Sequence, residues 1–454
     1  MLDDTSGRVA EAMVFYNPCS AVAINAVIEA LPETRFYIPY GYTREDLIDI
    51  IRTMPLAHDA ESYGTVRSFM TLITEYPQFL YFFNSNEQSI KDELRHWKID
   101  MKRGKPVPFP YEDVTAIWKL FRQDQIFREF VYRCISLTNS RNPRLKGSRT
   151  DIDALQEQYT GRVEFFPVND IIGNFSRDMV LATGNGRRTL IQGKPWSKYT
   201  LNYSHRTVLG DALVAQHSFW KNHFDLLPSS GVGVIFYEGV DMRAAGDTLF
   251  VGQQTWVVNY MAGSTPSHIE DELLRLSGMS NVIVVGKETR PLFPTHLDMY
   301  FVPFDDKHVG VGDMTPVVTF LEQQKRLKDI HVKSYKKRQP YLDRTSTELE
   351  RMGYVVSRIP LYVEFDPEGY DELTVSMHIR SFANEVRNGN ESILAPFGIP
   401  ALDDSGYEIF ERHGLTIKEI KSAGSLDTLL SYDPLYAPFC SGGIRCYVNV
   451  LERQ

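Results

Sequence analysis

The sequence predicts an α/β fold that is interrupted near its N-terminus by a helical block. Three observations support this prediction. Short apolar runs alternate with single helices over most of the chain, helical periodicity dominates one early segment, and 43% of the 454 residues are hydrophobic. A chain of this size and composition can bury a large core. Strands that alternate with helices are typical of α/β or α+β domains.

The first 42 residues predict one small α/β unit. A strand begins near Ala10, a helix follows over residues 21–31, and a short strand covers residues 35–38. A proline and a glycine then mark a turn, because both residue types interrupt regular structure. The unit therefore ends at about residue 42.

A helical block is expected from residue 43 to about residue 160. Thr43 is a favourable N-cap for its first helix. Residues 111–137 carry apolar side chains at three-to-four-residue spacing, which is the pattern of an amphipathic helix. Cys134 lies on this apolar stripe, so we interpret it as a buried thiol. The predicted domains are residues 1–42, the first α/β unit; residues 43–160, the helical insertion; and residues 161–454, the remainder of the α/β fold.

Beyond residue 161 the pattern changes to short strands separated by turn residues. A helix is expected over residues 266–277, between two of these strands. The predicted strands are residues 233–237, 281–286, 299–304, 353–365 and 392–396.

Composition argues against several classes of partner. The formal net charge is −9, whereas a nucleic-acid-binding surface is basic, so no nucleic-acid partner is expected. No uncharged apolar stretch reaches the roughly 18 residues of a membrane span, and the first residues are acidic, unlike a secretory signal. We therefore expect no membrane partner and a cytoplasmic location. The four cysteines lack the paired spacing of a structural zinc site and are too few for a disulfide framework.

Cys446 is a candidate nucleophile because of its neighbours. It follows Gly442 and Gly443 and precedes an apolar, strand-like segment at residues 447–451. Glycines allow a ligand to approach the backbone closely, and a thiol at such a junction can face a cleft. The same residues are equally typical of a glycine turn before a final strand.

His296 and Asp298 form the second candidate element. They stand directly before the apolar run at residues 299–302. If this segment is a strand, both side chains project from one face, because side chains alternate along a strand. A lone His-x-Asp is more often structural than functional.

Two acidic motifs complete the candidate set. Glu238 begins the segment Glu-Gly-Val-Asp, which ends at Asp241 and precedes a hairpin-like segment at residues 247–252. Arg177 and Asp178 precede another apolar run. Taken singly, a glutamate before a glycine is also typical of a solvated turn, and an Arg-Asp pair of a surface salt bridge.

In this order the four motifs resemble those of the guanidino-group-modifying superfamily, which includes arginine, agmatine and peptidylarginine deiminases, dimethylarginine hydrolases and glycine amidinotransferases. Residues 174–178 are similar to its motif ending in Arg-Asp, and residues 238–241 to its Glu-Gly-Gly-Asp. Residues 296–301 are similar to its His-Leu-Asp block, and residues 442–446 to its glycine-rich cysteine segment. The resemblance implies a five-bladed, pseudo-symmetric α/β propeller, or pentein, with the active site at its centre.

The branch of the superfamily stays open because the motifs are mixed. Val240 replaces a family glycine, and Trp256 stands where hydrolases often have arginine. Residues 241–244 and 259–260 are more similar to the amidinotransferases, whereas residues 384–398 are more similar to agmatine and peptidylarginine deiminases.

The resemblance also implies a role for each candidate residue. A guanidinium ion is a planar cation that carboxylates bind through paired hydrogen bonds. Asp178 and Asp298 are expected to bind this ion, and Cys446 to attack its carbon atom. His296 is expected to transfer protons, with Glu238 supporting it. This chemistry requires no metal and no organic cofactor.

The expected function is therefore a cysteine-dependent guanidine hydrolase, or deiminase. Its partner would be a guanidino small molecule or an arginine-containing substrate, converted through a covalent thiouronium intermediate to a ureido product and ammonia. One alternative is an amidinotransferase, in which an amine replaces water in the second step. The other is a non-catalytic interaction protein on the same scaffold.

Overall fold

The computed structural model describes residues 2–16, 21–40, 119–120, 123, 149–167, 180–183, 189–192, 225–227, 235, 237, 239–261, 263–287, 296–364, 378–420 and 444–454. Most of the segment predicted as a helical insertion lies outside these residues, and so do Asp178 and Glu238. Helix α7 (Arg149–Gln158) belongs to the described part of that segment.

The first sheet joins the two ends of the described chain. Its order is β17-β1-β2-β3. Strand β1 runs antiparallel to β17, with Ala12 opposite Val450, and parallel to β2. Strand β3 adds parallel to β2 on the far side. The bounds are β1 (Val9–Val14), α1 (Ala21–Ala30), β2 (Arg35–Tyr40), β3 (Val163–Pro167) and β17 (Val448–Arg453).

Four further sheets follow along the chain in the part that the structure describes. One consists of β4 (Val180–Thr183), β5 (Thr189–Gln192) and β6 (Asp225–Leu227), and the next of β7 (Met242–Ala245), β8 (Thr248–Gly252) and β9 (Asn281–Val285). The third consists of β10 (Phe301–Pro303), β11 (His308–Asp313), β12 (Val355–Glu364) and β13 (His378–Ser381). The last consists of β14 (Val386–Asn388), β15 (Glu391–Leu394) and β16 (Thr416–Glu419).

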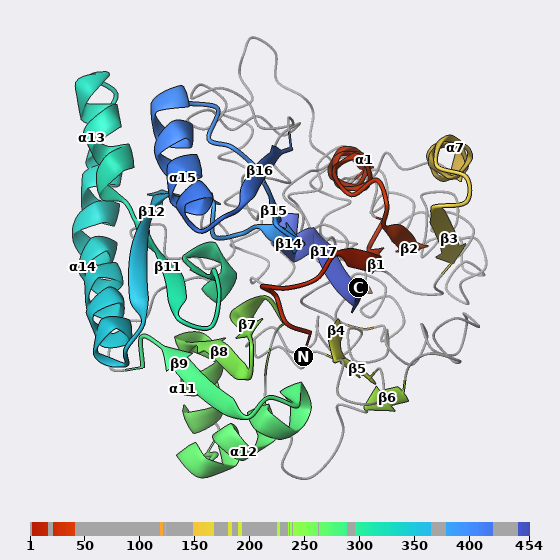
Figure 1. The fold of residues 1–454 in the computed structure, drawn as a ribbon, viewed down its shortest axis with the longest axis horizontal. Coiled ribbons are helices and arrows are strands. Elements are labelled where there is room, and N and C mark those ends of the chain that lie inside the picture. The colour runs from red at the N-terminus through yellow and green to blue at the C-terminus, as the bar shows by residue number, and fades with distance from the viewer. Residues whose placement is uncertain are drawn as a thin grey trace.

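The described sheets share one pairing pattern. Each contains an antiparallel pair, and the second strand of that pair then pairs with a parallel strand. A parallel neighbour requires a crossover connection, which is usually a helix. Helices in these crossovers are α1, α11 (Gln253–Met261), α12 (Pro266–Ser277), α13 (Thr315–Gln323), α14 (Asp329–Arg351) and α15 (Pro400–Arg412). In Figure 1 helices α12 to α15 lie toward the periphery of the molecule.

Helix α12 illustrates how local sequence determines an element. The Thr265 side chain accepts a hydrogen bond from the His268 N–H, and a proline occupies the first helical turn. The helix ends at Gly278, whose φ of 68° is the left-handed conformation that favours glycine. Ile269 and Leu273 are buried on one face. None of the described helices is both long and apolar enough to cross a bilayer.

A short helix near the end of the chain, α18 (Ile444–Tyr447), is attached to the core of the first sheet. Ile444 is fully buried, in a cluster that also contains Ile24 and Val27 of α1 and Val448 of β17. This packing joins α18 to helix α1 and to strand β17. It also fixes the part of the chain that carries Cys446.

Candidate active site

The structure describes three of the five candidate residues. His296 and Asp298 are described with their side chains, and Cys446 lies in α18 with its backbone described. Asp178 and Glu238 lie outside the described residues. The site can therefore be built upward from the segments around His296 and from α18.

The segment from His296 to Asp298 is not a strand, so the condition under which its two polar side chains would share a face is not met. Residues Leu297–Met299 form a short 3-10 helix, η4, and His296 is its N-cap. Strand β10 begins only at Phe301. A 3-10 helix has three residues per turn, so side chains two residues apart do not share a face. Asp298 is accordingly 0% exposed, whereas His296 is partly exposed.

Asp241 explains why a helical turn forms at this point. Its Oδ1 accepts a hydrogen bond from the Leu297 N–H at 2.9 Å. Its Oδ2 accepts two more, from the Thr255 N–H at 3.0 Å and the Thr255 hydroxyl at 2.6 Å. The carboxylate thus satisfies free N–H groups at the starts of η4 and α11. A Cβ atom on Gly252 would lie 1.8 Å from Oδ1, so the glycine leaves the space that the carboxylate fills.

Asp241 is also an electrostatic partner of His296. Burial raises the pKa of Asp241 to about 6, although His296 and the hydrogen bonds from Thr255 and Leu297 act in the opposite direction. The attraction of His296 thus favours the ionised form of the Asp241 carboxylate. Asp241 was noted within the Glu-Gly-Val-Asp segment, but no role was predicted for it from the sequence.

Helix α18 is linked to η4 by one side chain, that of Asn384. The Asn384 Oδ1 accepts a hydrogen bond from the Arg445 N–H at 2.8 Å. The Asn384 Nδ2 donates to the Met299 sulfur at 3.1 Å. The residue before Cys446 and the residue after Asp298 therefore contact the same buried amide. No role for Asn384 was predicted from the sequence.

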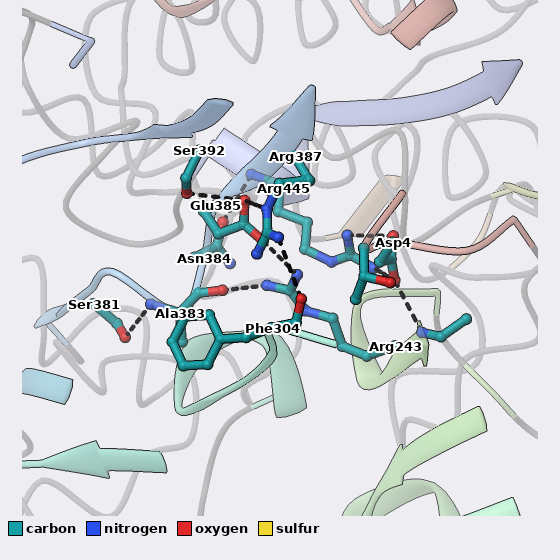
Figure 2. Close-up of polar contacts among 12 residues, drawn as sticks. Asp4, Arg243, Phe304, Ser381, Ala383, Asn384, Glu385, Arg387, Ser392 and Arg445 are labelled. Carbon is teal, nitrogen blue, oxygen red and sulfur yellow. Dashed lines mark hydrogen bonds and ion pairs between the residues drawn. The ribbon is translucent and has the colours of Figure 1, made fainter. Parts of the chain in front are cut away.

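A network of buried charges surrounds this link (Figure 2). The Asp4 carboxylate binds the Arg445 guanidinium through two hydrogen bonds of 2.8 and 2.7 Å. Glu385 lies 3.3 Å from Arg243 and 3.6 Å from Arg387. All five side chains are at most 4% exposed. Buried charges of this kind are rare unless they are paired.

Asp298 acts on two of these arginines. Burial, together with repulsion from Arg445, lowers the pKa of Arg243 to about 10, while Glu385, Asp4 and Asp298 oppose the change. Burial alone would lower the pKa of Arg445 as well, but the attraction of Asp4, with smaller contributions from Asp298 and Glu385, raises it. The candidate guanidinium-binding carboxylate is thus part of the same electrostatic network as α18.

The described part of the site combines groups suited to nucleophilic chemistry on a cation. It offers an imidazole beside a carboxylate, a second and fully buried carboxylate, and a helix that carries a cysteine. Such a set can bind a planar cation, deliver a thiol and move protons. Among the residues that the structure describes, no group of three or more His, Cys, Asp or Glu side chains is arranged to hold a metal ion.

No protein-family model and no curated protein matches the sequence. A solved structure of a candidate agmatine deiminase aligns with 100% of this chain and 95% of its own, with a TM-score of 0.52 and 9% identity. A candidate arginine deiminase from Porphyromonas gingivalis aligns with 94% of this chain and 96% of its own, with a TM-score of 0.44 and 12% identity. SxtG, an amidinotransferase of the saxitoxin pathway from Microseira wollei, aligns with 67% of this chain and 82% of its own, with a TM-score of 0.35 and 11% identity.

The first of these likenesses shows the fold of the chain. It extends over the whole sequence, although only 9% of the aligned residues are identical. The chain therefore has the mixed α/β fold of that candidate agmatine deiminase.

Proposed function

We propose, from a fold shared with the guanidino-group-modifying superfamily, that this chain is a cysteine-dependent guanidine hydrolase. Its substrate would be arginine or an arginine derivative, and its products a citrulline-type ureido compound and ammonia. The name of the structure with the highest TM-score among those above, a candidate agmatine deiminase, agrees with a small guanidino substrate.

The observation that carries this proposal is the place of the candidate residues relative to the sheets. Each stands a few residues before the strand that opens the antiparallel pair of its sheet. These positions are Asp178 before β4, Glu238 and Asp241 before β7, His296 and Asp298 before β10, Asn384 and Glu385 before β14, and Cys446 before β17. Equivalent positions in repeated units meet at one point if the units form a ring. We therefore propose that the five sheets are the blades of a propeller whose centre is the active site.

In the first half-reaction the Cys446 thiolate attacks the guanidinium carbon. Asp178 and Asp298 hold the guanidinium N–H groups, which orients the carbon over the sulfur. A C–S bond forms, and a tetrahedral intermediate results. His296 in its protonated form donates a proton to the departing nitrogen, the C–N bond breaks, and ammonia leaves. The substrate remains bound to the sulfur as a thiouronium group.

In the second half-reaction water replaces the thiolate. Neutral His296 takes a proton from the water, whose oxygen bonds to the same carbon atom. The C–S bond then breaks and the remaining hydroxyl proton passes to solvent, which releases the ureido product and restores the thiolate. Glu238 would orient the imidazole, and Asp241 supports it through the contacts described above. In an amidinotransferase the alkyl-substituted nitrogen, and not ammonia, leaves in the first half-reaction, so the sulfur holds only the amidino group. An amine then takes this group in place of water and forms a new guanidine.

The direct test is a product assay with three substrates: arginine, agmatine and a peptide that contains arginine. The wild-type protein is expected to release equal amounts of ammonia and ureido product from at least one of them. The matched control is Cys446→Ser, which is expected to release neither. A new guanidine formed after glycine or lysine is added would identify a transferase. If no guanidine is consumed, the proposal is wrong.

A further inference from the structure

Arg445 directly precedes the candidate nucleophile, and its guanidinium is buried. The side chain is 2% exposed, and the Asp4 carboxylate accepts two hydrogen bonds from it. The same guanidinium donates to the Met242 C=O at 3.2 Å. Figure 2 shows this pairing of Asp4 with Arg445. A residue near the first strand thus holds a residue in the last helix.

Asp4 is itself fixed to strand β7. Its N–H donates to the Ala244 C=O at 2.9 Å, and the Ala244 N–H donates to the Asp4 Oδ2 at 3.0 Å. Asp4 is 4% exposed, so water does not compete for these bonds. The carboxylate therefore connects β7, which follows the Glu238–Asp241 motif, to α18, which carries Cys446.

The backbone of α18 is held from a third direction. The Arg445 N–H donates to Asn384, which also contacts Met299 of η4. A helix of four residues has little stability of its own, because forming its first turn is unfavourable. The position of α18 is therefore imposed by its surroundings, which are the packing of Ile444 and these polar contacts.

We infer that Asp4, Arg445 and Asn384 form a brace that positions Cys446 relative to His296 and Asp298, with Asp4 as a positioning residue. The catalytic part of this inference rests on the proposed function. Stability alone does not account for the brace, since well-packed apolar residues often replace a buried ion pair without loss. A bidentate pair adds directional geometry that apolar packing lacks. The brace fixes the rotation of α18 as well as its position.

The test begins with Asp4→Asn, which keeps the shape of the side chain and removes its charge. Hydrogen exchange of the peptide that covers residues 444–449 is expected to quicken by about tenfold or more, as for the loss of a charged hydrogen bond. Turnover of the guanidine substrate is expected to fall about 10- to 100-fold in kcat through misplacement of the thiol, with little change in KM. Alkylation of Cys446 by iodoacetamide is expected to change in rate.

The matched control is Asp403→Asn in α15. Asp403 is 7% exposed, and its carboxylate accepts hydrogen bonds from the Phe397 and Ile399 N–H groups. The substitution therefore removes a buried, hydrogen-bonded carboxylate, as Asp4→Asn does. This control is expected to lower stability without quickening exchange in residues 444–449. If both variants give the same exchange there at equal loss of stability, the brace does not exist.

A second variant keeps the test decisive if Asp4→Asn does not fold. Arg445→Lys retains the buried charge but loses the paired hydrogen bonds, because an ammonium group cannot match the guanidinium fork. We expect the same local exchange and the same fall in kcat, with near-normal unfolding. Wild-type exchange and turnover in Arg445→Lys would overturn the inference. If the wild-type protein consumes no guanidine, the proposed function fails, and exchange alone still decides whether the brace is present.

Discussion

Two arginine–carboxylate pairs in this chain have nearly the same geometry and very different surroundings. The Arg445 Nη2 lies 2.7 Å from the Asp4 carboxylate, and the Arg275 Nη2 lies 2.8 Å from that of Glu272. The first two side chains are 2% and 4% exposed, whereas Arg275 is 51% exposed. The buried pair connects residues 441 positions apart, and the exposed pair connects neighbours on α12.

The difference shows that distance alone does not decide what an ion pair contributes. Exposed pairs typically contribute about 0–1 kcal/mol to the free energy of unfolding, because water competes and the side chains lose freedom. Breaking a buried pair by removing one partner costs about 3–5 kcal/mol, because a charge is left without compensation. The buried charges near α18 should therefore be sensitive to single substitutions, and the exposed charges on α12 should not.

The largest expected effect is that of Glu385→Gln. This change removes the carboxylate from two buried arginines, Arg243 and Arg387, and alters the acceptor for the Ser392 hydroxyl at 3.1 Å. We expect the free energy of unfolding to fall by about 3–5 kcal/mol, measured from urea denaturation. Adding Arg387→Met should recover part of the loss, because one uncompensated charge is then removed. A fall in the free energy of unfolding smaller than that of an exposed pair would show that burial does not make these charges sensitive to substitution.

The next effect is a dependence of stability on pH that comes from Asp241. Its pKa is raised from 3.8 to about 6 by burial, so the folded state holds this proton more tightly than the unfolded state. The associated stability is complete below about pH 4 and is lost as the pH rises through about 6, a total of about 3 kcal/mol. Urea midpoints measured from pH 4 to 7 should decline in the wild type and decline less in Asp241→Asn. Equal slopes would contradict the assignment.

A smaller effect is expected from Gly252→Ala. The added Cβ would lie 1.8 Å from Oδ1 of Asp241, so the carboxylate must move and its bond to the Leu297 N–H is strained. Overpacking of this kind costs about 1–3 kcal/mol. Thermal unfolding should show this loss. In the control Gly312→Ala the added Cβ would lie 2.6 Å from Cδ2 of Leu361, a smaller overlap, so this variant should lose less. Equal losses would mean that Asp241 is not held rigidly.

The smallest effect is expected from Glu272→Gln. Arg275 makes three hydrogen bonds to Glu272, of 2.8 to 3.2 Å, yet the two side chains are 51% and 19% exposed to water. The free energy of unfolding should change by about 0.5 kcal/mol or less, and by even less in high salt. Denaturation at two salt concentrations measures both quantities. A loss as large as that of Glu385→Gln would show that burial does not separate the two regions.

The elements with local signals are the ones that the sequence predicted well. Helix α12 was predicted over its full length, and in the structure Thr265, Pro266 and Gly278 mark its ends. Strands β9, β12 and β15 also fall within or close to their predicted ranges. The pairing of β1 with β17 was not predicted, because no local pattern indicates contact between segments about 440 residues apart. The helical insertion falls mostly outside the described residues and stays a prediction.

The candidate site could be predicted only in part, because several of its contacts join residues that are distant in sequence and leave no local pattern. His296 and Asp298 were singled out from the sequence, but their segment is not the strand that would place both on one face. Asp241, distant in sequence, accepts a hydrogen bond from the Leu297 N–H where a helical turn begins. Asp4 lies in a short polar segment that carries no motif, so its contact with Arg445 had no signal. The roles of all five candidate residues, Asp178, Glu238, His296, Asp298 and Cys446, stay predictions.

The most direct test of the central claim is to trap the covalent intermediate. The wild-type protein is mixed with arginine or agmatine, quenched rapidly in acid, digested and examined by mass spectrometry. The proposed mechanism predicts that the peptide containing Cys446 gains the mass of the substrate less ammonia. The same peptide from Cys446→Ser is expected to gain no mass. A gain equal to an amidino group alone would identify a transferase. An unmodified Cys446 during active turnover would contradict the role of this residue as the nucleophile.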